Sequence, residues 1–242
     1  MLERIEKLQI AILGLLLAFG FVIGVKYAVT PLSKNSVTVT GSAYEIVKSD
    51  SGNIEVALNV RRANKTLAYT AAKQQLPVIL EYLKSKDFDI DKDVDVKSMS
   101  GYSSYKYTAN GMSTNEIAYY NLTQMIHIKS DDVNKIKETA LDISSLMEKG
   151  IDIDVRRTSY SYSKLPELKV SLLKSATKDA QERAKAMLKS TNNGVGKIQS
   201  VRMGVFQITP VDSTDVSDMG ISDTSTIDKK ITAVSNVTFQ IK

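Results

Sequence analysis

One uninterrupted apolar run near the N-terminus restricts how this chain can fold more than any other feature. Between Lys7 and Lys26 the sequence reads LQIAILGLLLAFGFVIGV, in which Gln9 is the only polar side chain. A helix rises about 1.5 Å per residue, so this run spans roughly 27 Å, close to the thickness of one bilayer core. We therefore predict a transmembrane signal anchor over residues 8–29, preceded by a short cytoplasmic N-terminus at residues 1–7.

Two alternatives to an uncleaved anchor stay open: a cleaved signal peptide and a buried core helix. A signal peptide usually has a shorter apolar region, of about 7–15 residues. Pro31 disfavours cleavage at the bond before it, whereas a cut after Gly24 agrees with the sequence. Because Arg4 and Lys7 precede the run, the positive-inside rule places the N-terminus in the cytoplasm and the remaining chain outside. Residues 30–35 then form a polar tether.

The composition is that of a folded protein, and it excludes several kinds of functional site. Hydrophobic residues make up 43% of the chain and charged residues 24%, as in ordinary globular domains. There is no cysteine and a single histidine, His127, which excludes disulfides, thiolate zinc sites and cysteine nucleophiles and disfavours transition-metal sites. The net charge of +5 comes from lysines interleaved with acids, so we expect no nucleic-acid partner.

Alternation of apolar and polar residues predicts β-strands throughout the exported part. Ser36–Lys48 and residues 54–61 alternate in this way and are separated by the turn residues Ser49–Asn53, so we expect them to pair as an antiparallel hairpin. A second hairpin, rich in tyrosine, is expected from residues 94–107 and 115–129. The other three of the seven expected strands cover residues 151–163, 197–208 and 231–241.

Apolar residues at helical spacing predict three helices in the same part of the chain, over residues 63–86, 133–149 and 165–191. Pro77 lies inside the first helix and is expected to kink or interrupt it. The third carries a stripe of small residues that suits close packing on a sheet: Ala176, Ala180 and Ala184.

The predicted fold class is therefore α+β. An N-terminal transmembrane helix is followed by one extracytoplasmic domain over residues 36–242, in which antiparallel sheets of about seven strands are packed by three helices. Residues 209–228 are rich in Asp, Ser and Thr and are expected to form a long exposed polar loop. Such loops are common places for partner sites.

Short motifs spread along residues 36–242 make this chain resemble the SIMPL domain family, a domain of unknown function. They are Val37-Thr38-Val39-Thr40-Gly41, Asp50, the alanine stripe running into Asn193-Gly194-Val195-Gly196-Lys197-Ile198, Ser222-Asp223-Thr224-Ser225, and Ile231-Thr232-Ala233-Val234-Ser235-Asn236-Val237-Thr238-Phe239. The sequence departs from the family pattern at Ser42-Ala43 and at Ser49. The resemblance implies an α+β domain in the periplasm or outside a bacterial cell, anchored in the cytoplasmic (inner) membrane. It further implies no known enzymatic activity, links to stress phenotypes and a tendency to self-associate.

No set of residues indicates a catalytic, cofactor or metal site. His127 is flanked by isoleucines and has no second histidine, which is typical of a surface or interface residue. Ser161 and Lys164 fit a Ser-x-x-Lys spacing without its companion motifs. The aspartates at alternate positions from Asp87 to Asp95 suggest calcium ligands, but Lys92 and Ser98 stand where an EF-hand needs glycine and glutamate. A nonstandard cation site is the alternative to a solvated loop.

Two residue sets are candidates for contact with partners. The first is aromatic, since aromatics on exposed strands serve protein contacts as well as packing within one subunit: Tyr102, Tyr105, Tyr107, Tyr119, Tyr120, Tyr160 and Tyr162. The second could contact anions or acidic partners: Arg61, Arg62, Arg156 and Arg157.

The sequence thus predicts a membrane-anchored extracytoplasmic binding or assembly module without catalytic activity, acting as a homo-oligomer. The alternatives are an accessory subunit of a larger membrane complex that binds another protein, or a cation-dependent hydrolase.

Overall fold

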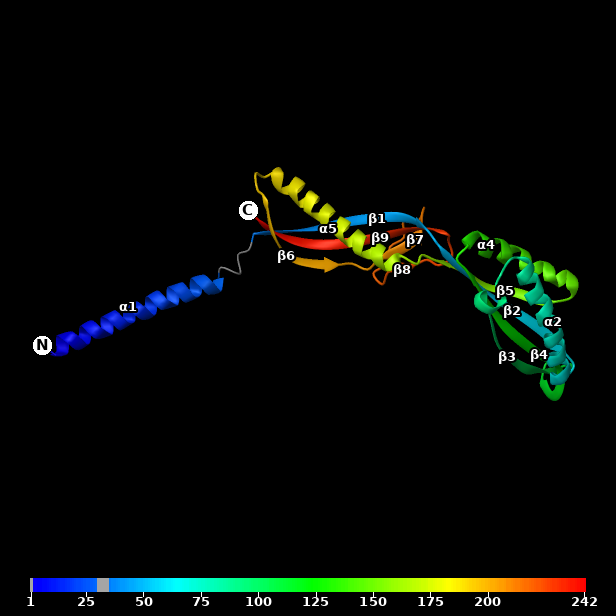
Figure 1. Cartoon of the computed structure of the whole chain (residues 1–242). Coiled ribbons are helices and arrows are strands. Elements are labelled where there is room, and N and C mark those ends of the chain that lie inside the picture. The colour runs from blue at the N-terminus through cyan, green and yellow to red at the C-terminus, as the bar shows by residue number, and fades with distance from the viewer. Residues whose placement is uncertain (1, 30–34) are drawn as a thin grey trace. The chain divides into compact units, whose positions relative to one another are not determined.

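The computed structural model describes the backbone of residues 2–29 and 35–242, and the side chains of residue 9, residues 12–25 and residues 35–242. Its first element is helix α1 (Leu2–Val29), shown in Figure 1. Among the residues so described, no helix is both long enough and apolar enough to cross a membrane. The predicted span at 8–29 includes side chains outside the described set, and most of the predicted tether at 30–35 also lies outside it.

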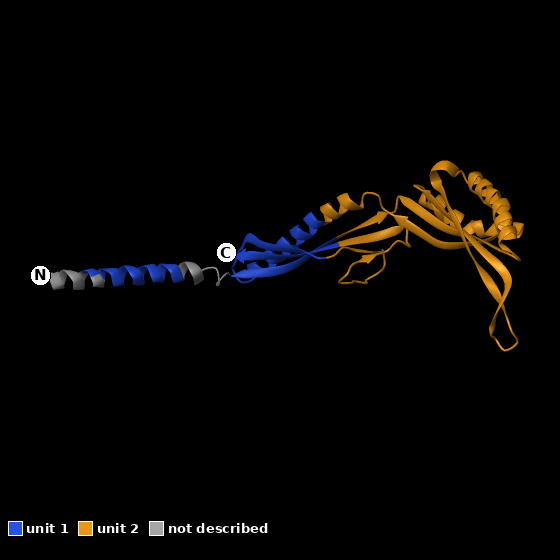
Figure 2. Ribbon diagram, turned by 90° about the horizontal axis from the view of Figure 1, so that it is seen from below, with its two compact units in different colours: residues 1–43, 173–204, 233–242 blue, residues 44–172, 205–232 orange. Residues whose placement is uncertain are grey.

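The chain divides into two compact units, coloured in Figure 2. Unit 1 contains residues 1–43, 173–204 and 233–242, and unit 2 contains residues 44–172 and 205–232. Residues 36–242, predicted as one extracytoplasmic domain, are therefore shared between both units. Three elements contribute residues to each of them: β1 (Ser36–Lys48), α5 (Leu165–Lys189) and β9 (Asp228–Ile241).

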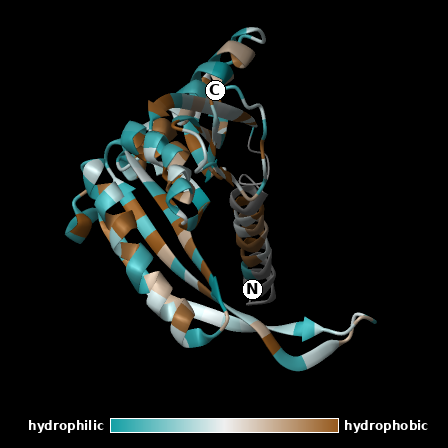
Figure 3. Cartoon of the chain, turned by 90° about the vertical axis from the view of Figure 1, so that its right-hand side faces the viewer, coloured by the Kyte–Doolittle hydropathy of each residue, from teal (hydrophilic) through white to brown (hydrophobic). Residues whose placement is uncertain are grey.

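Unit 2 is built on an antiparallel four-stranded sheet in the order β3-β4-β2-β5. Its strands are β2 (Ser51–Arg62), β3 (Val94–Tyr107), β4 (Ser113–Ser130) and β5 (Asp152–Ser161). Alternate residues of the two central strands point to one face, where Ile54, Val56 and Leu58 of β2 are fully buried with Ile126 and Ile128 of β4. Figure 3 shows this alternation as brown and teal bands along the strands.

Helices cover the apolar face of that sheet (Figure 1). They are α2 (Lys65–Ser85), α4 (Val133–Asp142) and the short 3-10 helix η1 (Ile143–Lys149), while the single turn α3 (Ile90–Asp93) precedes β3. The expected helix at 133–149 is thus an α-helix that tightens into a 3-10 helix. Helix α2 runs through Pro77 as one element, so an interruption there is not observed. The opposite face of the sheet carries polar and charged side chains.

Unit 1 is a smaller layer in which part of α5 packs on three strands. Strand β9 lies between β1 and β6 (Val195–Met203). Ala176, Ala180 and Ala184 are fully buried in α5, which confirms the close packing predicted from their small size. Helix α5 approaches β1 closely at Gly41, where an added Cβ would lie 2.1 Å from the carbonyl oxygen of Ala176.

Two predictions about strands were wrong. The segments at 36–48 and 54–61 do not form a hairpin, because β1 pairs with β9 while β2 has β4 and β5 on its two sides. The residues that the structure describes form nine strands, where seven were expected. The expected strand at 197–208 is divided into β6 and β7 (Gln207–Pro210), which pair with successive parts of β9, and the short β8 (Ile221–Ser222) lies within the expected loop.

Candidate functional site

The tyrosine-rich hairpin extends beyond the four-stranded sheet of unit 2. Strand β2 pairs with β4 only as far as Tyr120, so residues 113–119 have β3 as their only strand partner within the described chain. Figure 2 shows the resulting two-stranded ribbon leaving the sheet and ending in a loop. We call residues 102–119 the hairpin arm. An ion pair of 3.0 Å between Lys106 Nζ and Glu116 Oε2 links its two strands.

Four of the seven candidate tyrosines lie on this arm. Tyr102 and Tyr107 are 66% and 73% exposed, and Tyr105 is also exposed. The ring of Tyr119 is half-buried, with the guanidinium carbon of Arg61 4.5 Å from its centroid. Met112 and Ile117 add exposed apolar surface to the same arm. The arm therefore presents aromatic and aliphatic side chains that pack against little of their own unit.

The other three candidate tyrosines belong to the body of unit 2. Tyr160 is 7% exposed and lies in the hydrophobic core, where burial raises the pKa of its hydroxyl. Tyr120 packs against the same core and lies over Gly101, where a Cβ would come within 2.8 Å of its hydroxyl. Tyr162 is half-buried, and its carbonyl accepts a hydrogen bond from the Leu165 amide. The buried Tyr160 side chain is not available to a partner.

The four candidate arginines do not converge on one site. Arg61 stacks on Tyr119, and Arg62 Nη1 donates to the carbonyl of Arg61 at 2.7 Å, near the end of β2. Arg156 pairs with Asp154 at 3.3 Å, and Arg157 lies opposite Glu55. Glu55 and Arg61 are separated by roughly 20 Å of extended strand. The arginines therefore form two separate pairs.

Three of the five aspartates from Asp87 to Asp95 make local contacts through their carboxylates: Asp89, Asp93 and Asp95. The Asp89 carboxylate accepts from the Asp91 amide at the start of α3 and pairs with Lys92 at 2.9 Å, while Asp95 pairs with Lys97. These hydrogen-bonded lysines lower the pKa of both carboxyls. Across the described residues, no three histidine or acidic side chains are arranged to hold a metal ion.

His127 belongs to a row of polar side chains, here called the charged row after its Asp95, Glu55 and Arg157, on the open face of the four-stranded sheet. The strand registers place Asp95 opposite His127, His127 opposite Glu55, and Glu55 opposite Arg157. Direct cross-strand neighbours share one face, with Cβ atoms about 5 Å apart. The row borders a cavity of about 690 Å³ that is also lined by Asn53, Lys129 and Thr224. The sequence identified His127 as isolated and could not show these neighbours.

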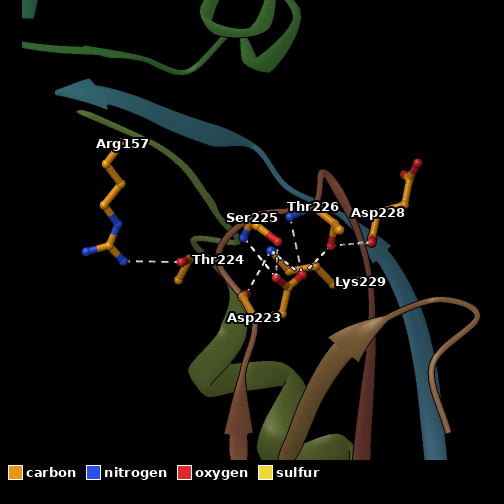
Figure 4. A network of polar contacts seen from close by, with 7 residues as sticks. All are labelled: Arg157, Asp223, Thr224, Ser225, Thr226, Asp228 and Lys229. Carbon is orange, nitrogen blue, oxygen red and sulfur yellow. Dashed lines mark hydrogen bonds and ion pairs between the residues drawn. The ribbon is translucent and has the colours of Figure 1, made fainter. Parts of the chain in front are cut away.

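A buried ion pair joins the loop after β8 to the start of β9, as Figure 4 shows. The side chains of Lys229 and Asp223 are only 3% and 8% exposed, and Lys229 Nζ lies 3.4 Å from Asp223 Oδ2. Lys229 Nζ also donates to the Asp223 carbonyl at 2.8 Å. The hydroxyls of Ser225 and Thr226 donate to the same carboxylate. Both oxygens of the Asp223 carboxylate thus accept hydrogen bonds from nearby residues of the loop and of β9.

This network fixes the loop against β5. Burial alone would raise the pKa of Asp223, but hydrogen bonds from Thr226 and Ser225 and the charge of Lys229 hold it far below its usual range. Burial lowers the pKa of Lys229, against the opposing effect of Asp223. The neighbouring Thr224 accepts from the Tyr160 amide through its carbonyl at 2.7 Å and from Arg157 Nη2 through its hydroxyl at 3.3 Å. The C-terminal part of the expected polar loop is therefore an anchored segment.

Asp50 makes a second fixed turn in unit 2. Burial opposes its ionisation, yet the amide and hydroxyl of Ser163 donate to its two carboxylate oxygens at 2.7 and 2.6 Å and lower its pKa. The Asp50 amide donates to the Ser161 carbonyl at 3.0 Å. Asp50 and Asp223 therefore stabilise turns of the fold.

Two sheets, a set of covering helices and polar turns define an α+β protein whose described residues contain no metal-binding group of three acidic or histidine side chains. The chain belongs to the SIMPL family, a protein family of unknown function (DUF541), whose model matches residues 37–240. That match runs from β1 to β9 and confirms the resemblance drawn from the sequence motifs. A comparison with curated proteins finds no match.

Proposed function

We propose that this protein is a membrane-anchored, extracytoplasmic binding and assembly module without catalytic activity, and that it acts as a homo-oligomer through the hairpin arm. The observation that carries the proposal is the arm itself. Its exposed Tyr102, Tyr107 and Met112 lie on a ribbon of only two strands. An isolated two-stranded ribbon is marginally stable in water and gains stability when a further layer packs on it. Tyrosine and methionine are also enriched in protein interfaces.

A second copy of the chain is the partner that needs the fewest additional assumptions. Most soluble oligomers are symmetric, with one surface patch contacting the same patch of the next copy. The arm suits such a contact because its apolar side chains can pack against the same side chains of a second copy. Binding to another protein in a membrane complex remains the second candidate, since the same exposed aromatics support it.

The anchor is supported by the sequence of α1. The described side chains from Ile12 to Val25 are apolar apart from their glycines, and large ones such as Leu15 and Phe21 are more than 70% exposed. A helix that is apolar over this length and whose large side chains are exposed is suited to a lipid environment. The charged residues before the apolar run favour an exported C-terminal part.

Light scattering on the full chain in mild detergent, with the detergent contribution subtracted, tests the assembly proposal. The expected mass is a multiple of the chain mass. Replacing Tyr102, Tyr105 and Tyr107 together by serine should reduce it to a single chain, because about 1 kcal/mol or more of contact is lost at each buried aromatic position. The matched control replaces the exposed Tyr44 and Tyr69, which lie outside the arm, by serine. A monomeric parent, or a triple variant with the parent mass, contradicts the proposal.

A further inference from the structure

The charged row on the open face of the four-stranded sheet has an arrangement that the proposed assembly does not use. Its members come from four neighbouring strands, with Asp95 opposite His127, His127 opposite Glu55 and Glu55 opposite Arg157. The register between β2 and β5 shifts between Glu55 and Val56, so Glu55 still faces Arg157, and direct cross-strand neighbours leave the sheet on the same side. They border one cavity of about 690 Å³, a volume in the range of small-molecule sites.

One side of this cavity is held in place by the anchored loop. Arg157 Nη2 donates to the Thr224 hydroxyl, and the Thr224 carbonyl accepts from the Tyr160 amide. The buried pair of Asp223 and Lys229 fixes the loop that carries Thr224. A guanidinium with one donor already directed to a fixed hydroxyl loses less freedom when it binds a ligand.

The charged groups on the cavity differ in whether they already have partners. Asp95 pairs with Lys97, and Lys92 pairs with Asp89. Glu55 and Lys129, in contrast, take no part in the ion pairs and side-chain hydrogen bonds found among the described residues. Glu55 and Arg157 are adjacent in register without an ion pair between them. The cavity therefore presents a carboxylate and a cation side by side, both able to accept a ligand.

The adjacent opposite charges determine the class of ligand. A simple anion on Arg157 would be repelled by Glu55, and a simple cation on Glu55 would be repelled by Arg157, since at a few ångströms such effects reach about 1 kcal/mol even in water. A molecule that carries both an ammonium and a carboxylate satisfies the two groups together. Lys129 lies two strands from Arg157 and two residues along the strand, at roughly 12 Å, and is placed for a second acidic group.

We propose that this cavity binds a small zwitterion with an α-ammonium and a carboxylate, a free amino acid or a short peptide, with the ammonium on Glu55 and the carboxylate on Arg157. His127 supplies a hydrogen-bonding imidazole beside the ammonium site. Lys129 favours a ligand with an acidic side chain. This site is independent of the hairpin arm, so its outcome does not depend on the assembly.

Calorimetric titration of the full chain in detergent tests the site with named probes: L-glutamate, L-alanine and L-alanyl-L-alanine. The blocked forms N-acetyl-L-glutamate and L-alaninamide lack one charge each. We expect L-glutamate to bind at least tenfold more tightly than its acetylated form, and L-alanine at least tenfold more tightly than its amide. Tighter binding of the dipeptide than of either amino acid assigns the site to peptides, and the reverse assigns it to free amino acids. The absence of binding by all three zwitterions up to about 10 mM, or equal binding of blocked and free forms, overturns the proposal.

Variants that each remove one charge locate the two binding groups. Glu55→Gln should weaken L-glutamate binding at least tenfold and remove the penalty of acetylation, whereas Arg157→Gln should weaken it while leaving that penalty in place. Arg156→Gln is the matched control, because Arg156 is an exposed neighbour that pairs with Asp154 and does not line the cavity. An equal loss in the control contradicts the assignment. The comparison of blocked and free probes on the parent protein needs no variant and stays decisive if a substitution disturbs folding.

Discussion

At the scale of single residues, the buried pair of Asp223 and Lys229 is the least replaceable polar feature of unit 2. Each of these side chains is less than one tenth exposed, and each would be a buried charge without the other. The carboxylate additionally accepts the hydroxyls of Ser225 and Thr226. Since Thr224 follows Asp223 directly, the pair also positions the residue that Arg157 contacts.

Asp223→Asn should therefore lower the free energy of unfolding by about 3–5 kcal/mol, because it leaves the Lys229 ammonium buried and uncompensated. Urea unfolding near neutral pH measures this loss. Asp215→Asn is the control, since Asp215 lies in the loop between β7 and β8 with an exposed side chain, and it should change stability by less than about 0.5 kcal/mol. Adding Lys229→Met to Asp223→Asn should restore part of the loss. A double variant less stable than Asp223→Asn contradicts the explanation.

The same carboxyl predicts a pH dependence. Its pKa is lower in the folded than in the unfolded state, so its contribution to stability is present above about pH 4 and is lost as the pH falls further. The lowered pKa values of Asp50 and Asp179 act in the same direction. The stability difference between the parent and Asp223→Asn should shrink as unfolding is measured from neutral pH down to about pH 3. A difference that stays constant over that window would show that the charge of Asp223 is not responsible.

Sequence patterns predicted some of these residues and missed others for physical reasons. Asp223 and Ser225 were among the motif residues that carry the family resemblance, but the sequence predicted only a long exposed polar loop around them. Lys229 is buried because other parts of the fold cover the start of β9. A local sequence pattern does not contain that information. Tyr160 was grouped with the exposed tyrosines because alternation identifies the two faces of a strand but not which face the helices cover.

At the scale of elements, the contact between β1 and α5 in unit 1 depends on the absence of side chains. Ala176 and Ala180 bring the helix backbone against Gly41, and Asp179 Oδ2 accepts from the Ser42 amide at 2.8 Å. Hydrogen bonds from this amide and from Arg183 lower the pKa of Asp179. The alanine spacing predicted a close approach, but it did not identify the glycine that the helix would meet.

Gly41→Ala should destabilise the protein by about 1–3 kcal/mol, because the added methyl would overlap backbone atoms that have no rotamer to relieve the contact. Thermal or urea unfolding measures the change. Gly194→Ala is the matched control, since its nearest neighbour would be Lys242 Cβ at 3.7 Å, an ordinary contact. Equal stability of the two variants would mean that the helix moves away at little cost.

The pairing of strands shows where local patterns stop being informative. Most element positions, such as β1 at 36–48 and β3 at 94–107, were predicted from alternation alone. The partner of β1 is β9, almost 200 residues later, whereas the turn at Ser49–Asn53 suggested its neighbour β2. Ser49 and Asp50 instead bond to Ile227 and Ser161, so the chain passes there from one sheet to the other.

At the scale of the whole molecule, the proposal joins three separable parts: an apolar helix for the membrane, a hairpin arm for assembly and a charged cavity for a small ligand. The family match covers residues 37–240 and therefore supports the fold of the exported part. It assigns no activity to any of the three. The central claim concerns the arm, because its exposed aromatic side chains become buried only in contact with a partner.

Site-specific photo-crosslinking in intact membranes tests that claim most directly. A photoreactive phenylalanine derivative replaces Tyr107 in the full chain, and the same residue at Tyr44 is the control, since both positions are exposed but only Tyr107 belongs to the arm. After illumination, the account predicts an adduct at Tyr107 with twice the chain mass that contains peptides of this chain alone. No adduct at Tyr107, or one that contains a different protein, would contradict self-assembly through the arm.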